Sequence, residues 1–482
     1  MESARLPFTF ARDNQVALDG AALLIGPEAT VNGLREARRR AAAALTPTPL
    51  GAVEFQSALA RLYDDSATKS TDTDVAFDLE DPDRPGATRD LLEDATEAPV
   101  IRLVNQLLRQ AVRAEASDLH LEPHEEGLRA RMRVDGTMQT VFDRRDVPAR
   151  RVVSRLKVMA RLDIAETRLP QDGRIALRLG GRAIDLRVST LPGHYGERVV
   201  MRLLDRTSGL MALDRLGLDG DQAAMLQRLA ALPNGIILAT GPTGSGKTTT
   251  LYSLLQLADR SERNILTVED PVEYDLPGVS QTQVNADIGL NFARGLRSIL
   301  RQDPDVILVG EIRDAETALV ASEAALTGHL VFSSLHANNA LSAVVRLREL
   351  GVDNYLISAT LRGVIAQRLA RRLCPECRTT RTLTEQEARL FTDHGLTAPL
   401  QLGQAQGCPA CEGTGYDGRV GVFDILEIDD PLREAIDAGA PEARMRALTG
   451  RHGSALFTAA LARVATGVTS LEEVRRVIGE SA

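Results

Sequence analysis

The sequence predicts an α/β protein: a largely parallel sheet covered by helices, preceded by an Arg-rich α+β domain. From about Leu210 onward, short apolar runs alternate with helical segments, as in a parallel sheet with both faces covered. The runs are 236–240, 264–268, 306–309 and 330–334. Upstream, apolar and polar residues alternate between Gly-rich turns, which indicates antiparallel strands with one solvated face. These strands are expected at 128–136, 174–182, 183–190 and 197–204, with helices from Val100 and over 150–162.

The composition is that of a soluble globular protein of two to four domains. The chain has 482 residues, of which 44% are hydrophobic and 26% charged. Its net charge of −9 argues against a protein that coats nucleic acid, because such proteins need a basic face. No stretch approaches the ~18 consecutive apolar residues of a membrane span, and the N-terminus lacks the apolar region of a signal peptide. We therefore expect a cytoplasmic protein.

Changes in composition along the chain predict six parts. Residues 1–63 are expected to form a small helical module: Arg35–Leu45 is helix-prone, a Pro-rich stretch interrupts it, and residues 51–63 have helical spacing. Residues 64–98 are rich in Asp and poor in apolar residues, which is typical of a flexible linker, with an acidic binding tail as the alternative. The other parts are the Arg-rich domain at 99–208, the parallel-sheet core at 209–372, a four-cysteine subdomain at 373–412 and a helical region at 413–482.

A Gly-rich turn follows the first apolar run and precedes a helical segment. The sequence Gly241-Pro242-Thr243-Gly244-Ser245-Gly246-Lys247-Thr248 fits the phosphate-binding loop Gly-x4-Gly-Lys-[Ser/Thr], and Thr249 continues into the helix. Glycines let backbone amides point at an anion, and the helix offers phosphate its free amides and positive dipole end. Lys247 can reach the β- and γ-phosphates, and the Thr248 hydroxyl can bind Mg2+. The turn therefore predicts a nucleoside triphosphate site.

Carboxylates follow the second and third apolar runs. Glu269, Asp270 and Glu273 come at the end of the second run, where they could bind Mg2+ through water or orient an attacking water. A loop whose acids merely face solvent is the alternative. Glu311 follows the third run and a Gly, as the acid of a Walker B strand does, and could hold Mg2+ or polarise the water.

Two histidines, His329 and His336, flank the fourth apolar run. A His at the end of a strand beside a nucleotide can sense phosphate, whereas a structural His is the alternative. Both are candidates for coupling the nucleotide to the rest of the protein.

The four cysteines form two Cys-x2-Cys pairs, separated by residues 378–407. The pairs are Cys374 with Cys377 and Cys408 with Cys411. Four thiolates suit tetrahedral zinc and leave no open position, so we predict a structural zinc site. Disulfides or a redox pair are the alternatives, and a cytosolic chain disfavours disulfides. The spacer exceeds the usual zinc-ribbon length and should form a small loop or helical insert.

Together these motifs resemble those of the secretion traffic ATPases, from Ile101 onward. The Cys tetrad is typical of the subset that includes type II secretion and type IV pilus assembly ATPases. Leu6-Pro-Phe-Thr-Phe-Ala-Arg and the short N-terminal region resemble the type II secretion members, the general secretory pathway protein E family. One departure is mild: Ser333-Ser-Leu-His-Ala-Asn-Asn stands where the family commonly has Ser-Thr-Leu-His-Thr-Asn. The matching segments are 169–174, 191–198, 241–248, 267–273, 310–314 and 327–339.

The resemblance implies a RecA-like core that binds ATP and Mg2+, preceded by a PAS-like α+β domain that closes over the nucleotide. It also implies a homo-hexamer, peripheral on the cytoplasmic face of the inner membrane, whose N-terminal module docks on a secretion platform protein. Its nucleotide-contacting arginines correspond to Arg187, Arg202, Arg297, Arg301 and Arg419. An Arg supplied from another domain or subunit can neutralise transition-state charge, whereas a solvated strand-edge Arg is the alternative.

We therefore expect a cytoplasmic ATPase that drives pseudopilus assembly in type II secretion. In this reading Lys247 holds phosphate, Thr248 and Glu311 hold Mg2+, and Glu269 or Glu273 helps orient water. Type IV pilus assembly is the alternative motor. A nucleic-acid translocase is disfavoured by the net negative charge, and a nucleotide-gated scaffold without turnover is a further alternative.

Overall fold

The structure is a computed structural model, and its described residues fall in two compact units, Met1–Ala76 and Phe77–Ala482. The predicted linker at 64–98 lies outside these residues except for Ala98, as does most of the helix expected at 51–63. Within the described part of the chain, no helix combines the length and apolar character needed to cross a membrane. The described residues are 6, 10–11, 14–19, 22–41, 45–51, 55, 58, 98–179, 182–205, 211–450 and 454–479.

The N-terminal unit contains a small sheet as well as a helix, which corrects the prediction of a helical module at 1–63. β2 pairs antiparallel with β1 and parallel with β3. Strands of four residues are too short to show an alternating pattern. Pro47 and Pro49, which break a helix, are accepted on an edge strand. The elements are β1 (Val16–Asp19), β2 (Ala22–Ile25), α2 (Val31–Arg40) and β3 (Thr46–Pro49).

The second unit begins with a six-stranded antiparallel sheet of order β6-β5-β4-β9-β8-β7, packed on two helices. The predicted strands and helices of this region are present. The sequence did not indicate β4 and β6, because charged and polar residues occupy most of their positions. The elements are α4 (Ala98–Arg113), β4 (Asp118–His124), β5 (Gly127–Val134), β6 (Thr137–Arg144), α5 (Ala149–Met159), β7 (Gln171–Leu179), β8 (Arg182–Leu191) and β9 (Arg198–Asp205).

A buried ion pair holds two loops of this domain together. Lys157 on α5 pairs with Glu197, and the side chains are 1% and 9% exposed. The Lys157 ammonium also donates to the main-chain oxygen of Glu166, 2.6 Å away. The lysine therefore joins the loop before β7 to the loop before β9.

Removing the acid of this pair should destabilise the domain strongly. Glu197→Ala leaves the Lys157 ammonium buried without its counter-ion, so we expect a loss of about 3–5 kcal/mol in the free energy of unfolding. Urea denaturation of the full chain, with hydrogen exchange as the probe of this domain, measures the loss. Glu125→Ala, which removes an exposed acid, is the control and should change stability by less than about 0.5 kcal/mol. Equal stability of the two variants would contradict the prediction.

The C-terminal part is built on a seven-stranded sheet of order β12-β11-β13-β14-β10-β15-β18. Neighbouring strands are parallel except for β15 and β18. The four predicted apolar runs form β10, β11, β13 and β14, whereas β18 lies where the sequence suggested a helical region at 413–482. The strands are β10 (Gly235–Thr240), β11 (Ile265–Glu269), β12 (Ser280–Gln283), β13 (Val306–Val309), β14 (Leu330–Leu335), β15 (Leu361–Leu373) and β18 (Tyr416–Glu427).

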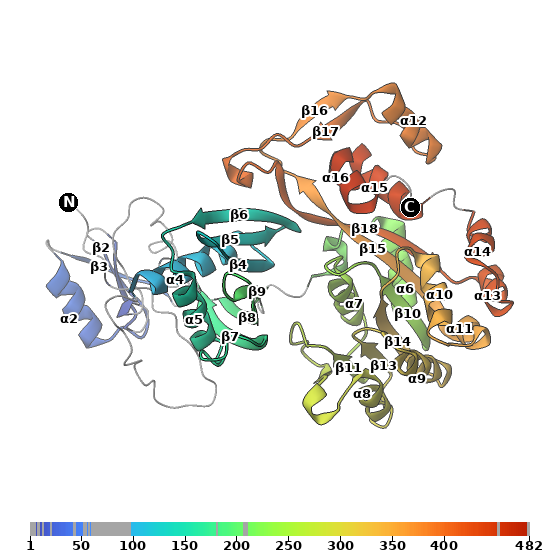
Figure 1. Cartoon of the computed structure of the whole chain (residues 1–482), viewed down its shortest axis with the longest axis horizontal. Coiled ribbons are helices and arrows are strands. Elements are labelled where there is room, and N and C mark those ends of the chain that lie inside the picture. The colour runs from blue at the N-terminus through green and yellow to red at the C-terminus, as the bar shows by residue number, and fades with distance from the viewer. Residues whose placement is uncertain are drawn as a thin grey trace. The chain divides into compact units, whose positions relative to one another are not determined.

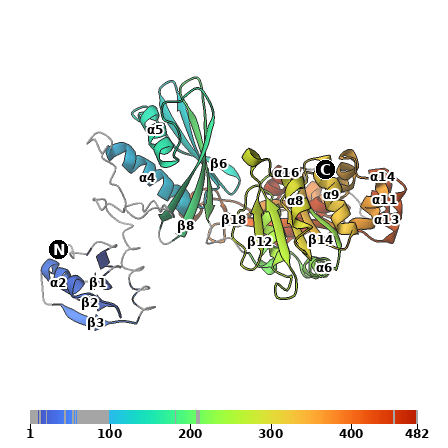
Figure 2. The same cartoon turned by 90° about the horizontal axis from the view of Figure 1, so that it is seen from below.

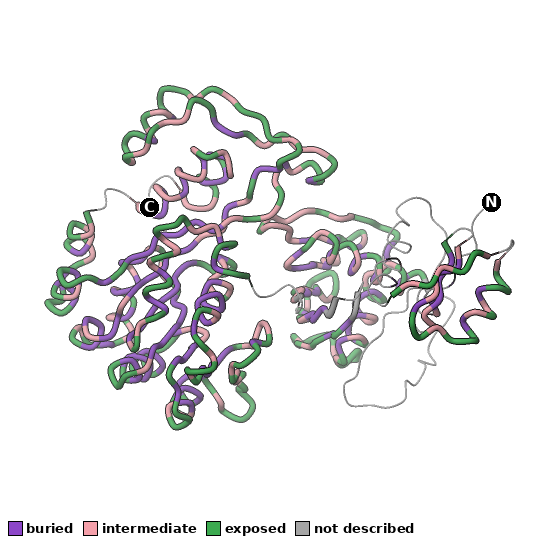
Figure 3. Tube along the Cα trace, turned by 180° about the vertical axis from the view of Figure 1, so that it is seen from behind, coloured by how far each residue is buried: buried purple, intermediate pink, exposed green. Residues whose placement is uncertain are grey.

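Helices cover both faces of this sheet (Figures 1 and 2). Every residue of β10, β11, β13 and β14 is buried between them (Figure 3). One face packs against α6 (Gly220–Ala230) and α7 (Lys247–Leu255). The other packs against α8 (Phe292–Ile299), α9 (Ala315–Leu326), α10 (Ala340–Glu349), α11 (Asn354–Thr360), α13 (Asp430–Asp437) and α14 (Glu442–Leu448).

β15 and β18 form a long ribbon that continues past the sheet to the cysteines. β15 pairs with β10 only as far as Ala366, whereas its pairing with β18 extends to Leu373. The segment between the two cysteine pairs contains the helix α12, as the predicted insert allowed, with a two-stranded sheet. The remaining elements are β16 (Thr379–Thr382), α12 (Glu385–Asp393), β17 (Gln401–Gln404), α15 (Ala455–Ala465) and α16 (Leu471–Ile478).

Candidate functional site

The phosphate loop joins the buried strand β10 to helix α7. Its three glycines have φ values of 148° at Gly241, 77° at Gly244 and 88° at Gly246, a region that favours glycine. The Lys247 ammonium donates to the main-chain oxygens of Gly241 (2.9 Å) and Pro242 (3.0 Å), which folds the loop around the lysine. The exposed Thr248 lies in the first turn of α7.

The loop rests directly on β15. A Cβ atom at Gly241 would lie 2.5 Å from the main-chain oxygen of Gln367, and one at Gly246 would lie 2.8 Å from the Gln367 side-chain nitrogen. The Gln367 amide oxygen accepts from Thr250 Oγ1 on α7 (2.7 Å). The buried Ser245 hydroxyl has no hydrogen-bond partner among the described residues. That unsatisfied hydroxyl, the lysine and the helix amides together fit a phosphate group.

The neighbouring strands β13, β14 and β10 are parallel, so their carboxyl ends lie at one edge of the sheet. Glu311, His336 and Lys247 follow these ends and therefore lie at that edge. Burial lowers the pKa of Lys247, and the negative charge of Glu311 opposes that shift. Glu311 forms an ion pair with Arg313, and its Oε2 lies 3.5 Å from His336 Nε2. A carboxylate here is placed to bind a cation beside phosphate, with His336 next to it.

Glu269 and Glu273 occupy different environments, although both follow β11. Glu269 is 3% exposed and accepts hydrogen bonds from three side chains. The donors are the Tyr252 hydroxyl, Thr267 Oγ1 (2.6 Å) and Gln281 Nε2 (3.0 Å). Burial and the Glu269 charge raise the pKa of Tyr252, which therefore remains a donor. Glu269 is thus occupied within the protein and is poorly placed to meet a water molecule.

Glu273 is half-buried and lies opposite an arginine from the antiparallel domain. Its Oε2 is 3.5 Å from Arg187 Nη2 on β8. Burial raises the pKa of Glu273, while Arg187 opposes the shift, and burial also lowers the pKa of Arg187. A partly desolvated carboxylate with a cation beside it suits a group that orients water.

The other predicted arginines have partners away from the phosphate loop. Arg202 Nε lies 3.2 Å from Asp118, and Arg419 Nε lies 3.2 Å from Asp135. On α8, Arg297 Nη1 lies 2.5 Å from Glu316 Oε1, and Arg301 donates to the main-chain oxygen of Arg297. Arg202 stands opposite Arg187 in the pairing of β8 with β9, and its positive charge also opposes the rise in the pKa of Glu273. Arg297, Arg301 and Arg419 bind the partners named above.

His329 lies at the edge of the sheet where the parallel strands begin, whereas the loop lies at the edge where they end. It precedes β14, and its main-chain oxygen accepts from the Gly235 amide at the start of β10. The six residues of β10 separate that edge from the loop by about 20 Å. The His329 ring meets the Ala324 oxygen at 2.8 Å, so within the chain His329 caps helix α9 rather than approaching the loop.

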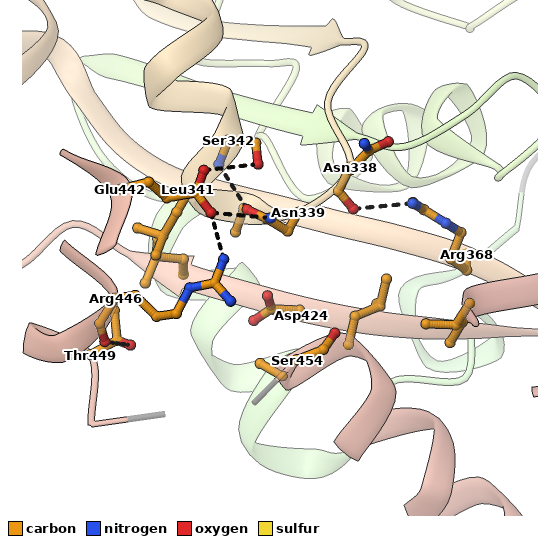
Figure 4. A pocket seen from close by; sticks show the side chains of 15 residues that line it. Asn338, Asn339, Leu341, Ser342, Arg368, Asp424, Glu442, Arg446, Thr449 and Ser454 are labelled. Carbon is orange, nitrogen blue, oxygen red and sulfur yellow. Dashed lines mark hydrogen bonds and ion pairs between the residues drawn. The ribbon is translucent and has the colours of Figure 1, made fainter. Parts of the chain in front are cut away.

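The sequence did not single out Arg368, which lies beside the loop and binds the segment after His336: a Cβ atom at Gly241 would lie 3.2 Å from Arg368 Nη1. Its guanidinium donates to the main-chain oxygens of Gln367 (3.0 Å) and Asn338 (3.1 Å), and burial lowers its pKa. Arg368 also lines a cavity of about 510 Å³ in which Glu442 pairs with Arg446 (Figure 4). Arg368 is one of several arginines in β15, and nothing in its spacing distinguishes it from the others.

The four cysteine sulfurs converge at the end of the β15–β18 ribbon. All lie within 4.8 Å of one another, with separations of 3.7 Å for Cys408 and Cys411 and 3.8 Å for Cys377 and Cys411. Sulfurs bound about 2.3 Å from a tetrahedral zinc would be about 3.8 Å apart, so the donor set fits zinc. Burial opposes ionisation of Cys411, but amide hydrogen bonds from Cys408 and Gly415 outweigh it and lower its pKa to about 6.

Two family models match the chain. One, described as Type II/IV secretion system protein, matches residues 93–476, and the other, which describes an N-terminal domain of GSPII protein E, matches residues 5–63. The chain is also 46% identical over 493 residues to the Type II secretion system ATPase E of Vibrio cholerae. That match covers 99% of this chain and 97% of the relative.

Solved structures share the fold at lower identity. The Legionella pneumophila ATPase DotB matches with a TM-score of 0.57 and 22% identity, covering 78% of this chain and 95% of that chain. The pilus retraction motor PilT with bound ADP matches with a TM-score of 0.53 and 24% identity, covering 77% and 95%. These likenesses show a mixed α/β fold shared with ATPases.

Proposed function

We propose a role for each site residue from the premise that this chain belongs to the Type II/IV secretion system protein family and is a type II secretion ATPase. Lys247 and the loop amides hold the β- and γ-phosphates of ATP. Thr248 and Glu311 hold Mg2+, which when bound neutralises phosphate charge. The convergence of Lys247, Glu311 and His336 at the ends of three adjacent strands carries this proposal.

Glu273 is the carboxylate that orients the attacking water, and Arg187 neutralises charge that develops on the phosphate. The ion-pair distance of 3.5 Å between them supports this assignment. Glu269 does not face water but is held by Tyr252, Thr267 and Gln281. We therefore separate the two candidate acids, one as the water-orienting group and one as a structural carboxylate.

The active form is a homo-hexamer, in which Arg202, Arg297, Arg301 and Arg419 reach nucleotide or stabilise subunit contacts. ATP turnover rotates the PAS-like domain at 99–208 against the RecA-like core at 209–372, and His336 transmits the state of Glu311. The residues at 1–63 dock on an inner-membrane platform protein, so the motor is peripheral on the cytoplasmic face and drives pseudopilus assembly. The match of residues 5–63 to an N-terminal domain of GSPII protein E supports a docking role for that module.

The experiment is phosphate release by the purified full chain with ATP and Mg2+, compared with Lys247→Ala. We expect Lys247→Ala to lose about 10²–10³-fold in kcat, because it removes the charge that stabilises the transferring phosphoryl group. Glu262→Gln, an exposed acid beyond α7, is the control and should retain wild-type turnover. Undiminished turnover in Lys247→Ala would exclude the loop from the reaction.

A further inference from the structure

The segment that carries Glu273 has little regular structure of its own. Residues 270–279 join β11 to β12 and contain neither helix nor strand. Backbone groups in such a segment lack ladder partners, so other groups must fix its path. A side chain that binds this backbone therefore also sets where Glu273 stands.

Gln281, on the edge strand β12, binds that backbone on both sides of Asp275. Its Nε2 donates to the main-chain oxygen of Tyr274 (3.0 Å), and its Oε1 accepts from the Leu276 amide (2.7 Å). Tyr274 is the residue directly after Glu273. One carboxamide thus supplies the donor and the acceptor that a neighbouring strand would otherwise supply.

The same carboxamide is tied to the phosphate-loop helix. Gln281 Nε2 also donates to Glu269 Oε1 (3.0 Å), and the other oxygen of Glu269 accepts from the Tyr252 hydroxyl. Tyr252 is 1% exposed and lies on α7, the helix that begins with Lys247. A chain of hydrogen bonds, buried at Tyr252 and Glu269, therefore runs from α7 through Gln281 to the backbone beside Glu273.

We propose that Gln281 is a positioning residue for ATP hydrolysis. It holds Glu273 in place relative to the phosphate loop through the hydrogen bonds that join Tyr252, Glu269 and Gln281. The proposal rests on the proposed function, because it assumes that Glu273 orients water at this site. It assigns no contact between Gln281 and nucleotide. Its effect should therefore fall on turnover rather than on nucleotide binding.

The geometry requires a carboxamide at position 281. Glu has the same size but would set a second carboxylate against Glu269 and could not donate to Tyr274. Met has a similar volume but neither donates nor accepts strongly. Gln281→Met removes both hydrogen bonds to the Glu273 segment, whereas Gln281→Glu loses the donor to Tyr274 and keeps an acceptor for the Leu276 amide.

The test is ATP hydrolysis by the full-length Gln281→Met and Gln281→Glu variants. We expect kcat to fall by about 10-fold or more, because small misplacements of a catalytic group are costly, while KM for ATP changes by less than about 3-fold. Binding of a fluorescent ATP analogue should be unchanged. Gln283→Ala is the matched control: it alters an exposed Gln on the same strand and should keep wild-type kcat.

A double variant that exchanges the side chains at positions 269 and 281 separates the loss of these hydrogen bonds from a general loss of folding. Gln281→Glu combined with Glu269→Gln restores one charge and a donor–acceptor pair, so it should recover part of the kcat lost in Gln281→Glu. Wild-type kcat in Gln281→Met, or a loss confined to KM and ATP-analogue binding, overturns the proposal. If Gln281→Met does not fold, the absence of any recovery in the swap overturns it as well. A wild-type chain that releases no phosphate would instead overturn the proposed function, so the two failures are distinguishable.

Discussion

Replacing Glu273 with Gln is expected to lower kcat for ATP hydrolysis by about 10²–10⁴-fold while ATP still binds. Glutamine keeps the size of the side chain but cannot accept a proton from water. The positive charge of Arg187, 3.5 Å away, remains available to the phosphate, so nucleotide affinity should fall little. Single-turnover phosphate release and equilibrium binding of an ATP analogue separate the two quantities.

The control for this variant lies two residues further along the same segment. Asp275 is exposed, and Asp275→Asn removes a charge without approaching Arg187. It should retain kcat within about 2-fold, as surface substitutions generally do. If Glu273→Gln hydrolysed ATP at the wild-type rate, another group would have to orient the water, and the assignment of Glu273 would be wrong.

Removing zinc from the predicted four-cysteine site is expected to unfold the end of the β15–β18 ribbon. Purified protein should contain about one zinc per chain, because four converging thiolates bind it without an open position. A strong chelator, or Cys411→Ala, should raise hydrogen exchange over 374–415 to that of unfolded chain, since structural zinc supplies folding free energy directly. Mass spectrometry of exchanged peptides and metal analysis measure the two effects.

The exchange should spread from the cysteines into α16. Arg371 stacks on the Tyr416 ring at 3.9 Å and pairs with the buried Glu473, and the Tyr416 hydroxyl meets Ser470 at 2.7 Å. Glu376→Gln changes an exposed residue between two cysteines and should leave zinc content and exchange unchanged. A chain that held less than about 0.2 zinc, with the 374–415 region protected and insensitive to chelator, would contradict a structural zinc site.

The sequence predicted the parts of the fold whose physics is local. Buried parallel strands need nearly continuous apolar runs, and β10, β11, β13 and β14 have them. β12, with the sequence Ser-Gln-Thr-Gln, is an edge strand without such a run, and the arginines in β15 obscure its buried positions. β12 becomes recognisable only through its pairing with β11, and β15 only through its pairing with β10 and β18.

The same limit applies to the site. The phosphate loop follows from spacing alone, and the end of a parallel strand locates Glu311 and His336. Strand polarity also separates His329 from the loop, although the sequence analysis placed both histidines near nucleotide. Spacing could not rank Glu269 against Glu273, because the difference depends on Tyr252, Thr267 and Gln281, which come from three different elements.

The β15–β18 ribbon sets the distance between the phosphate loop and the cysteine cluster. Gln367, against the phosphate loop, and Leu373, beside the first cysteine, are six residues apart on one paired strand, or about 20 Å. The strand can hardly lengthen, because its backbone is already close to the full extension of about 3.3–3.6 Å per residue. A displacement of the phosphate loop along β15 would therefore be passed to the cysteine cluster at the other end of the strand, rather than absorbed by stretching between them.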